Sequence, residues 1–272
     1  MTMKGKTVIV TGGTSGIGKA LAFEFGSKGA NILITGRNQQ RLDEVIQEFS
    51  GKGIRLRGIQ ADVSQEADNQ RMVDAALQHF GCIDILINNA GMSMRALFEE
   101  VDLKVLHTLM NVNFWGTVYA TKYALPHIIQ QKGSVIGISS IAGYRGLPAR
   151  AGYSASKFAM QGFLEVLRTE MLPKGVHVLT ACPGFTASNI RTTALTKDGN
   201  TQGESPRNEG NMMSAEECAS HIYKATCKRK KTLILTQQGK LTVFLNKLFP
   251  GWMDKMVFNH MAKEEDSPFK KL

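Results

Sequence analysis

Cysteines are few in this sequence and stand far apart. The chain of 272 residues contains four of them, and no two form a CxxC pair. Such scattered cysteines give neither a disulfide framework nor the ligand spacing of a zinc site. The six histidines are equally dispersed, so we expect no metal. The four cysteines are Cys82, Cys182, Cys218 and Cys227.

Long hydrophobic runs are also lacking. No window holds about 18 uninterrupted apolar residues, which is the length that a membrane-spanning helix needs. Residues 1–6 lead directly into a strand-like run, which is not the pattern of a signal peptide. The default expectation is therefore a cytoplasmic protein.

Aromatic ladders and nucleic-acid-binding motifs are absent, although the formal net charge is +10. Much of the basic character is local, as in Lys228–Lys231, which we interpret as a solvated helix end. We expect no nucleic-acid partner. With 43% apolar and 21% charged residues, the composition is that of a globular protein long enough for a large core.

A glycine-rich turn follows the first apolar run. Lys6–Thr11 reads as a short strand, and the TGxxxGxG pattern that starts at Thr11 precedes a helical pattern. A turn of this kind lets the backbone approach a pyrophosphate, and the helix start offers free N–H groups to it. The candidate dinucleotide-binding residues here are Gly12, Thr14, Ser15, Gly16, Ile17 and Gly18.

The stretch from Ser140 to Lys157 contains the candidate catalytic residues. Tyr153 and Lys157 are four residues apart in a helical pattern, so the two side chains share a face. A neighbouring ammonium lowers the pKa of a phenol, which suits a proton donor or acceptor at a carbonyl oxygen. We therefore predict Tyr153 as the acid/base and Lys157 as the group that lowers its pKa.

Ser140 follows an apolar run and lies thirteen residues before Tyr153. With the glycine turn and the YxxxK pair, this spacing resembles the short-chain dehydrogenase/reductase family, and the resemblance extends from Gly5 to about Thr236. It implies a Ser140, Tyr153 and Lys157 site, and an asparagine that holds a water beside the lysine. Asn113 aligns with that asparagine, with Asn111 as the alternative.

The resemblance also assigns further contacts to the cofactor. Asp62 and Val63 would border the adenine, and Asn89, Ala90 and Gly91 match the family's NNAG element beside the cofactor. Pro183 and Gly184 would support the nicotinamide, with a hydroxyl from Ser188 or Thr186 on its carboxamide. Tyr153 and Lys157 would also contact the cofactor.

Arg37 follows the second strand, where an NAD-specific site places an acidic residue. No acid appears until Asp43, so we predict NADP(H), with Arg37 on the 2′-phosphate. A basic residue often precedes the second motif glycine in NADP-binding relatives, and this chain has Ser15 there.

Seven strand-like runs alternate with helical patterns, which predicts an α/β fold with a doubly wound, seven-stranded parallel Rossmann sheet. We expect one domain over 1–239 and a helical extension over 240–272. The polar, irregular segment 189–214 is predicted to be a substrate loop. The strands are expected at 6–11, 31–35, 54–60, 83–87, 134–139, 177–181 and 232–236.

The extension has apolar residues at helical spacing, interrupted by Pro250-Gly251. Its apolar stripes, opposite lysines, fit peripheral contact with a membrane surface, contact with a partner subunit, or packing on the chain's own core. The tail loosely resembles lipid-type keto reductases such as acyl/alkyl-dihydroxyacetone phosphate reductase.

These features predict an NADP(H)-dependent oxidoreductase that interconverts a ketone and a secondary alcohol. The alternatives are a membrane-surface keto-lipid reductase and a non-catalytic NADP-binding scaffold. The family resemblance implies a homodimer or homotetramer, associated through residues 102–123 and 153–172.

Overall fold

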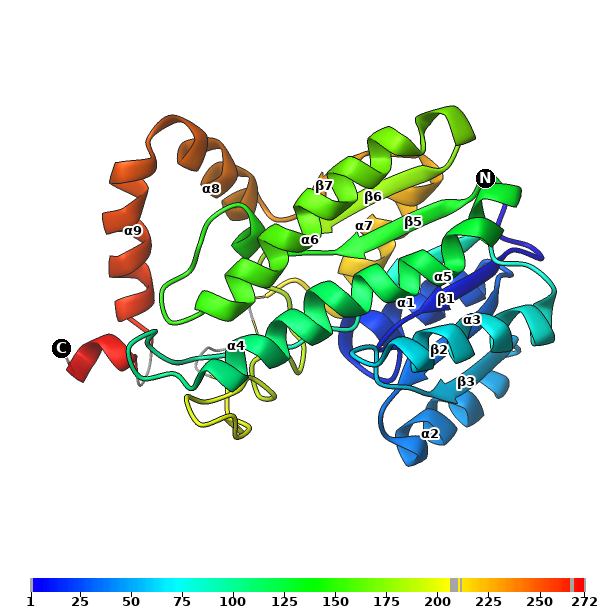
Figure 1. Ribbon diagram of the computed structural model, residues 1–272, viewed down its shortest axis with the longest axis horizontal. Coiled ribbons are helices and arrows are strands. Elements are labelled where there is room, and N and C mark those ends of the chain that lie inside the picture. The colour runs from blue at the N-terminus through cyan, green and yellow to red at the C-terminus, as the bar shows by residue number, and fades with distance from the viewer. Residues whose placement is uncertain (1, 206–209, 211, 265–266, 272) are drawn as a thin grey trace.

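The computed structural model describes residues 2–205, 210, 212–264 and 267–271. Its centre is a parallel sheet of seven strands in the order β3-β2-β1-β4-β5-β6-β7 (Figure 1), as the sequence predicts. The strands are β1 Thr7–Val10, β2 Asn31–Gly36, β3 Leu56–Gln60, β4 Ile85–Asn88, β5 Ser134–Ile138, β6 His177–Cys182 and β7 Thr232–Ile234.

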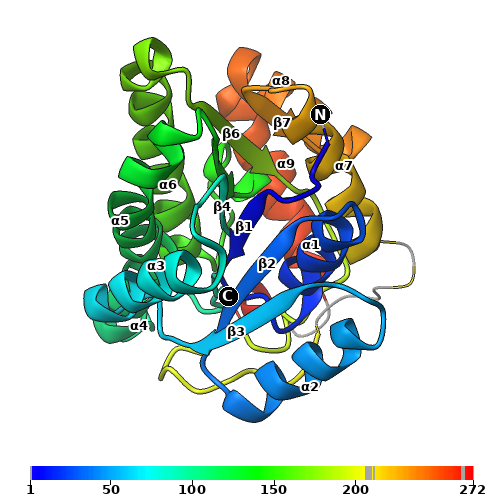
Figure 2. The same ribbon diagram turned by 90° about the vertical axis from the view of Figure 1, so that its right-hand side faces the viewer.

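Helices cover both faces of this sheet (Figure 2). Ile32 and Ile34 of β2 face a core shared with one helix layer, while Leu33 between them faces the core of the other layer. Because both faces are buried, the strands are almost continuously apolar. The first layer contains α1 Gly16–Ser27, α2 Gln39–Ser50 and α7 Ala215–Cys227. The second contains α3 Glu66–Phe80, α5 Gly116–Gln130 and α6 Ala151–Glu170.

The helix expected over 102–123 is not uniform. It consists of α4 Leu103–Leu109, a π-helical turn over Met110–Trp115, and α5. A π turn adds a residue to the helical repeat and re-aims the side chains within it. Asn113 is buried in this turn, whereas Asn111 is exposed. Short 3-10 turns complete the fold at Ile141–Gly143, Leu172–Lys174 and Pro268–Lys271.

The C-terminal extension forms two helices, α8 Gln237–Leu248 and α9 Pro250–Ala262, so it begins slightly before the predicted residue 240. Met253, Val257 and Met261 of α9 are buried together against Leu147, which precedes α6. One face of α9 thus packs on the chain's own core. Within the described residues, no helix is both long and apolar enough to cross a membrane.

The predicted substrate loop 189–214 is irregular where it is described, and 206–209 and 211 lie outside the described residues. Leu195 forms bridges with Met94 and Thr201. The Arg95 N–H donates to the Leu195 carbonyl over 2.8 Å, and the Leu195 N–H donates to the Ser93 carbonyl over 2.9 Å. These bonds hold the loop against the segment that follows β4.

Candidate active site

A cleft of about 450 Å³ opens at the carboxyl ends of the central strands. β1 and β4 are neighbours, and the chain order runs outward from them in opposite directions. In open parallel sheets, ligands bind at such a switch point. Every candidate residue named from the sequence lines this cleft except Asn113 and Asn111.

The glycine turn forms one wall of the cleft. Its glycines are needed because neighbouring backbone and side-chain atoms lie too close to leave room for a Cβ. A Cβ on Gly18 would lie 2.2 Å from the Gly12 carbonyl oxygen, and Gly12 and Gly16 have φ of +64° and +51°. The Asn89 amide donates to the Thr11 and Gly12 carbonyls over 2.9 and 3.1 Å. The turn therefore exposes backbone to the cleft, and this cradle fits the pyrophosphate of a dinucleotide.

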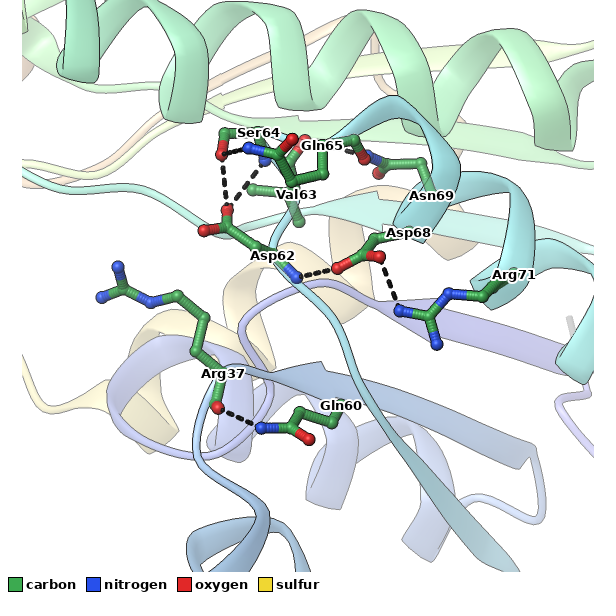
Figure 3. Close-up of polar contacts among 9 residues, drawn as sticks. All are labelled: Arg37, Gln60, Asp62, Val63, Ser64, Gln65, Asp68, Asn69 and Arg71. Atoms are coloured by element: carbon green, nitrogen blue, oxygen red, sulfur yellow. Dashed lines mark hydrogen bonds and ion pairs between the residues drawn. The ribbon is translucent and has the colours of Figure 1, made fainter.

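Arg37 and Asp62 lie at one end of the cleft, which we call the Arg37 end (Figure 3). The Arg37 side chain is exposed, and its backbone carbonyl accepts a bond of 2.9 Å from Gln60 Nε2. The Asp62 carboxylate accepts bonds from the Ser64 N–H and hydroxyl, at 2.9 and 2.8 Å. The loop after β2 thus places a guanidinium where NAD-specific sites place an acid.

A second cation at this end was not predicted. Arg41 lines the cleft beside Arg37, and its N–H donates to Asn38 Oδ1 at the start of α2 over 2.9 Å. Asn38 is a good helix N-cap, so the sequence did contain a signal that Arg41 stands in the first turn of a helix. Two guanidinium groups and a helix start together favour an anion.

The opposite end, which we call the Tyr153 end, contains Ser140 and Tyr153. Ser140 caps the turn after β5, where its Oγ accepts a bond of 3.1 Å from the Ala142 N–H. Burial raises the pKa of the Tyr153 phenol, and a hydrogen bond with the Ser140 side chain offsets part of that rise. The phenol is therefore protonated at neutral pH.

Lys157 is almost fully buried one helical turn from Tyr153. Its Nζ donates to the Ile138 carbonyl over 2.8 Å and lies 5.9 Å from the Tyr153 ring centroid. Burial lowers the pKa of the ammonium to about 8. The amine points at the end of β5, and burial of the phenol is the largest influence on the pKa of Tyr153. That Lys157 lowers the pKa of Tyr153 stays a prediction.

Asn113 lies behind the cleft wall and holds two segments together. Its Oδ1 accepts from the Met92 N–H over 2.9 Å, and its Nδ2 donates to the Met92 carbonyl and to Ser156 Oγ over 3.0 and 2.8 Å. A Cβ on Gly91 would lie 3.1 Å from Asn113 Oδ1 and 3.5 Å from Lys157 Nζ. The amide thus braces the wall behind Lys157, and its role with a water stays a prediction.

The turn after β6 forms the wall opposite the glycine turn. A Cβ on Gly184 would lie 2.4 Å from the Thr236 hydroxyl, and Pro183 precedes it on the cleft. Thr186 is buried, and its hydroxyl donates to the Gly184 carbonyl over 3.4 Å. Ser188 is half-buried across from Gly16. Of the two hydroxyls, that of Ser188 is therefore less enclosed.

Several cleft residues at or near the Tyr153 end had no signal in the sequence. They come from segments far apart in the chain, and no local spacing connects them. They are Met92, Leu147, Arg150, Arg191, Met261 and Glu264.

Comparison with known proteins agrees with this architecture. The sequence profile of the short chain dehydrogenases matches residues 6–199. Dehydrogenase/reductase SDR family member 7B of Mus musculus is 34% identical over 97% of this chain and 84% of its own length. The 11-beta-hydroxysteroid dehydrogenase 1A of Arabidopsis thaliana is 33% identical over 90% of this chain and 72% of its own length.

Two solved structures have the same fold. A short chain dehydrogenase/reductase from Burkholderia phymatum in complex with NAD has a TM-score of 0.82 at 22% identity, covering 91% of this chain and 95% of that chain. An alcohol dehydrogenase from Thermococcus sibiricus complexed with 5-hydroxy-NADP has a TM-score of 0.74 at 22% identity, covering 85% and 95%. The chain therefore belongs to the short-chain dehydrogenase/reductase family of oxidoreductases.

Proposed function

We propose that this protein is an NADP(H)-dependent oxidoreductase that interconverts a small-molecule ketone and a secondary alcohol. The observation that carries the proposal is one cleft with Ser140, Tyr153 and Lys157 at one end and the glycine turn leading to Arg37 at the other. A phenol, a hydroxyl and an amine beside a dinucleotide cradle supply what carbonyl reduction needs from a protein.

When bound, NADPH supplies the hydride for the carbonyl carbon. The Ser140 hydroxyl would donate to the carbonyl oxygen and hold it beside the Tyr153 phenol. In reduction, the Tyr153 O–H bond breaks and the proton passes to that oxygen, which completes the alcohol. The phenol carries its proton at neutral pH, so it is available as the donor.

Lys157 would give a new proton to the phenolate, and its amine would then take up one proton from solvent for each turnover. Its pKa of about 8 leaves the amine able to give up a proton near neutral pH, and it stands one turn from the phenol. A positive charge also stabilises the phenolate that the reduction leaves behind. Asn113 would position this relay through its bonds to Met92 and Ser156.

The preference for the phosphorylated cofactor is supported by Arg37 and Arg41. Both side chains are exposed at the Arg37 end, and the carboxylate of Asp43 accepts from Gln39 Nε2 over 2.8 Å within α2. A guanidinium binds the 2′-phosphate of NADP(H) with charge-assisted hydrogen bonds. The uncharged 2′-hydroxyl of NAD(H) forms weaker hydrogen bonds with it.

A second candidate function, reduction of a keto-lipid at a membrane surface, is supported by the outer side of α8 and α9. Leu241, Phe244 and Phe249 are each more than half exposed, as is Trp252, while lysines occur on the same helices. An apolar helix face with basic residues is a common membrane-surface element. Peripheral contact through 241–272 would bring the Tyr153 end close to lipid.

Self-association as a homodimer or homotetramer is supported by a separate apolar surface. Trp115 in the π turn and Phe158 and Val166 on α6 are exposed at 43%, 47% and 58%. Neighbouring exposed apolar side chains on packed helices mark interaction surfaces. Sedimentation of the Val166→Glu variant should show a shift toward monomer if this surface is the interface, and an unchanged distribution would contradict it.

The test of the catalytic proposal is NADPH oxidation across ketones, keto-lipids and steroids, with Tyr153→Phe as the variant. We expect at least about a hundredfold loss of turnover with unchanged NADPH binding. Tyr123→Phe is the matched control, because that hydroxyl donates to Glu66 on the surface. Unchanged turnover in Tyr153→Phe would refute the role, and NADPH binding without turnover of any ketone would favour a scaffold.

A further inference from the structure

The end of the C-terminal extension reaches the Tyr153 end of the cleft. Met261 and Glu264 line the cleft together with Leu147 and Arg150, which precede the catalytic helix α6. Figure 1 shows α9 standing beside the loop that leads into α6, well away from the strands. The wall around the candidate substrate position therefore contains residues from the last part of the chain.

Glu264 is a buried carboxylate with cationic neighbours. Its side chain is 3% exposed, and its Oε2 lies 3.0 Å from Arg150 Nη2 and 3.6 Å from Arg95 Nε. A buried charge is costly unless it is paired, so the two guanidinium groups stabilise this buried carboxylate. Because Arg95 follows Met94, which bridges to Leu195 of the substrate loop, Glu264 links three separate segments.

The turn that Glu264 contacts is conformationally strained. Ala149 has φ of +60°, a region that residues with a Cβ rarely adopt, and it directly precedes Arg150. Such a conformation persists only where surrounding contacts hold it. Contacts that hold it include the bond of 3.0 Å from the Ala96 N–H to the Ala149 carbonyl, the bond of 3.1 Å from the Arg150 N–H to the Leu147 carbonyl, and the pairing of Arg150 with Glu264.

This turn leads directly into the helix that positions Tyr153. The Arg150 carbonyl accepts the Ser154 N–H over 2.8 Å in the first turn of α6, and the Ser154 hydroxyl accepts the Leu147 N–H over 3.1 Å. A displacement of Arg150, which lies three residues before Tyr153, would therefore move the start of α6.

We propose that Glu264 is a positioning residue that pins the C-terminal extension onto Arg150 and so fixes the strained turn, the start of α6 and the direction of the Tyr153 phenol. The expected effect of Glu264 on turnover rests on the proposed function. The expected ordering of the start of α6 by Glu264 is independent of that function. The extension then takes part in building the reaction site.

The first test measures hydrogen exchange, which needs no substrate. In Glu264→Gln, we expect amides of residues 147–157 to exchange about tenfold faster, while those of β1 and α1 do not change. Asp254→Asn is the matched control, because Asp254 also ties α9 to the core, through Arg145, at a site that does not line the cleft. It should leave 147–157 unchanged. Unchanged exchange in Glu264→Gln, or equal acceleration in both variants, would overturn the proposal.

The second test separates positioning from folding. We expect Glu264→Gln to lower kcat for ketone reduction about tenfold, with the NADPH Kd changed less than about twofold. A change confined to thermal stability, with kcat preserved, would refute positioning. If the wild-type protein reduces no ketone, the proposed function fails, whereas the exchange measurement still decides whether Glu264 orders the helix start.

Discussion

Lys157 Nζ donates a hydrogen bond of 2.8 Å to the carbonyl oxygen of Ile138, the last residue of β5. Helix α6 is thus attached to the central sheet by a buried amine. Burial disfavours the charged form of the amine, which accounts for its lowered pKa.

This burial predicts a pH-dependent stability. The folded-state pKa of Lys157 is about 8, below the usual lysine value of 10.5, so the unfolded chain binds more protons between these values. Stability from this group therefore rises with pH across that window, by up to about 3 kcal/mol. Urea unfolding should show Lys157→Met more stable than wild type at about pH 7, with the gap closing toward about pH 10.5. A gap independent of pH, or one matched by the exposed Lys122→Met, would contradict the assignment.

Gly18→Ala should damage the cofactor cradle. The added Cβ would lie 2.2 Å from the Gly12 carbonyl oxygen, a backbone atom, and 2.4 Å from Asn89 Nδ2, which is itself bonded to the Thr11 and Gly12 carbonyls. We expect a loss of about 1–3 kcal/mol in unfolding free energy and at least about tenfold weaker NADPH binding, measured by fluorescence titration. In Gly162→Ala, a Cβ meets nothing within 4 Å, so stability should rise by about 0.5–1 kcal/mol. Equal effects of the two variants would be inconsistent with a close-packed turn.

Arg37 and Arg41 should set the cofactor preference. The double variant Arg37→Ala/Arg41→Ala removes both guanidinium groups that line the Arg37 end. We expect kcat/KM with NADPH to fall by about 10- to 100-fold and that with NADH to stay within about threefold, because only the phosphate loses its partners. Arg55→Ala is the control, since that side chain stacks on Phe80. An equal decrease of kcat/KM with NADPH and with NADH would mean that Arg37 and Arg41 do not bind the 2′-phosphate.

Asn113→Leu should loosen the wall behind Lys157. The change leaves the Met92 N–H and carbonyl without the Asn113 amide, and a buried unpaired polar group costs about 1–3 kcal/mol. Chemical denaturation should show a loss of that size, whereas Asn111→Leu on the exposed side of the same turn should change stability by less than about 0.5 kcal/mol. Similar losses in both variants would argue against a bracing role.

Membrane contact is tested with vesicles of phosphatidylcholine and phosphatidylserine. Exchanging the exposed Phe249 and Trp252 for serine removes two large apolar groups from the outer side of the extension. We expect at least about tenfold weaker co-sedimentation with the vesicles. Phe98→Ser, which removes an even more exposed ring from a loop after β4, should not affect it. Absence of binding by the wild type, or equal binding by all variants, would exclude this surface.

Much of the fold followed from the sequence because its determinants are local. Continuous apolar runs such as Ile85–Ile87 predict buried parallel strands, and the glycine turn and YxxxK pair lie within single strand–helix units. Their convergence on one cleft follows from the carboxyl ends of parallel strands meeting at one edge.

What the sequence could not provide depends on tertiary packing. The pairing of Glu264 with Arg150 joins residues more than a hundred positions apart, and neither stands in a recognisable pattern. The π turn has the apolar spacing of an ordinary helix. The direction of the Lys157 amine is set by the position of β5, which helical spacing alone does not give.

The two ends of the cleft are formed by different parts of the chain. Its dinucleotide cradle comes from the first 91 residues together with the turn after β6, whereas the wall around Tyr153 draws on the segment after β4, the approach to α6 and the end of α9. If the proposed function is correct, sequence changes in residues 250–264 would alter which substrates are accepted and leave cofactor binding unchanged. Exchanging that stretch between relatives is accordingly a direct route to redesigning selectivity.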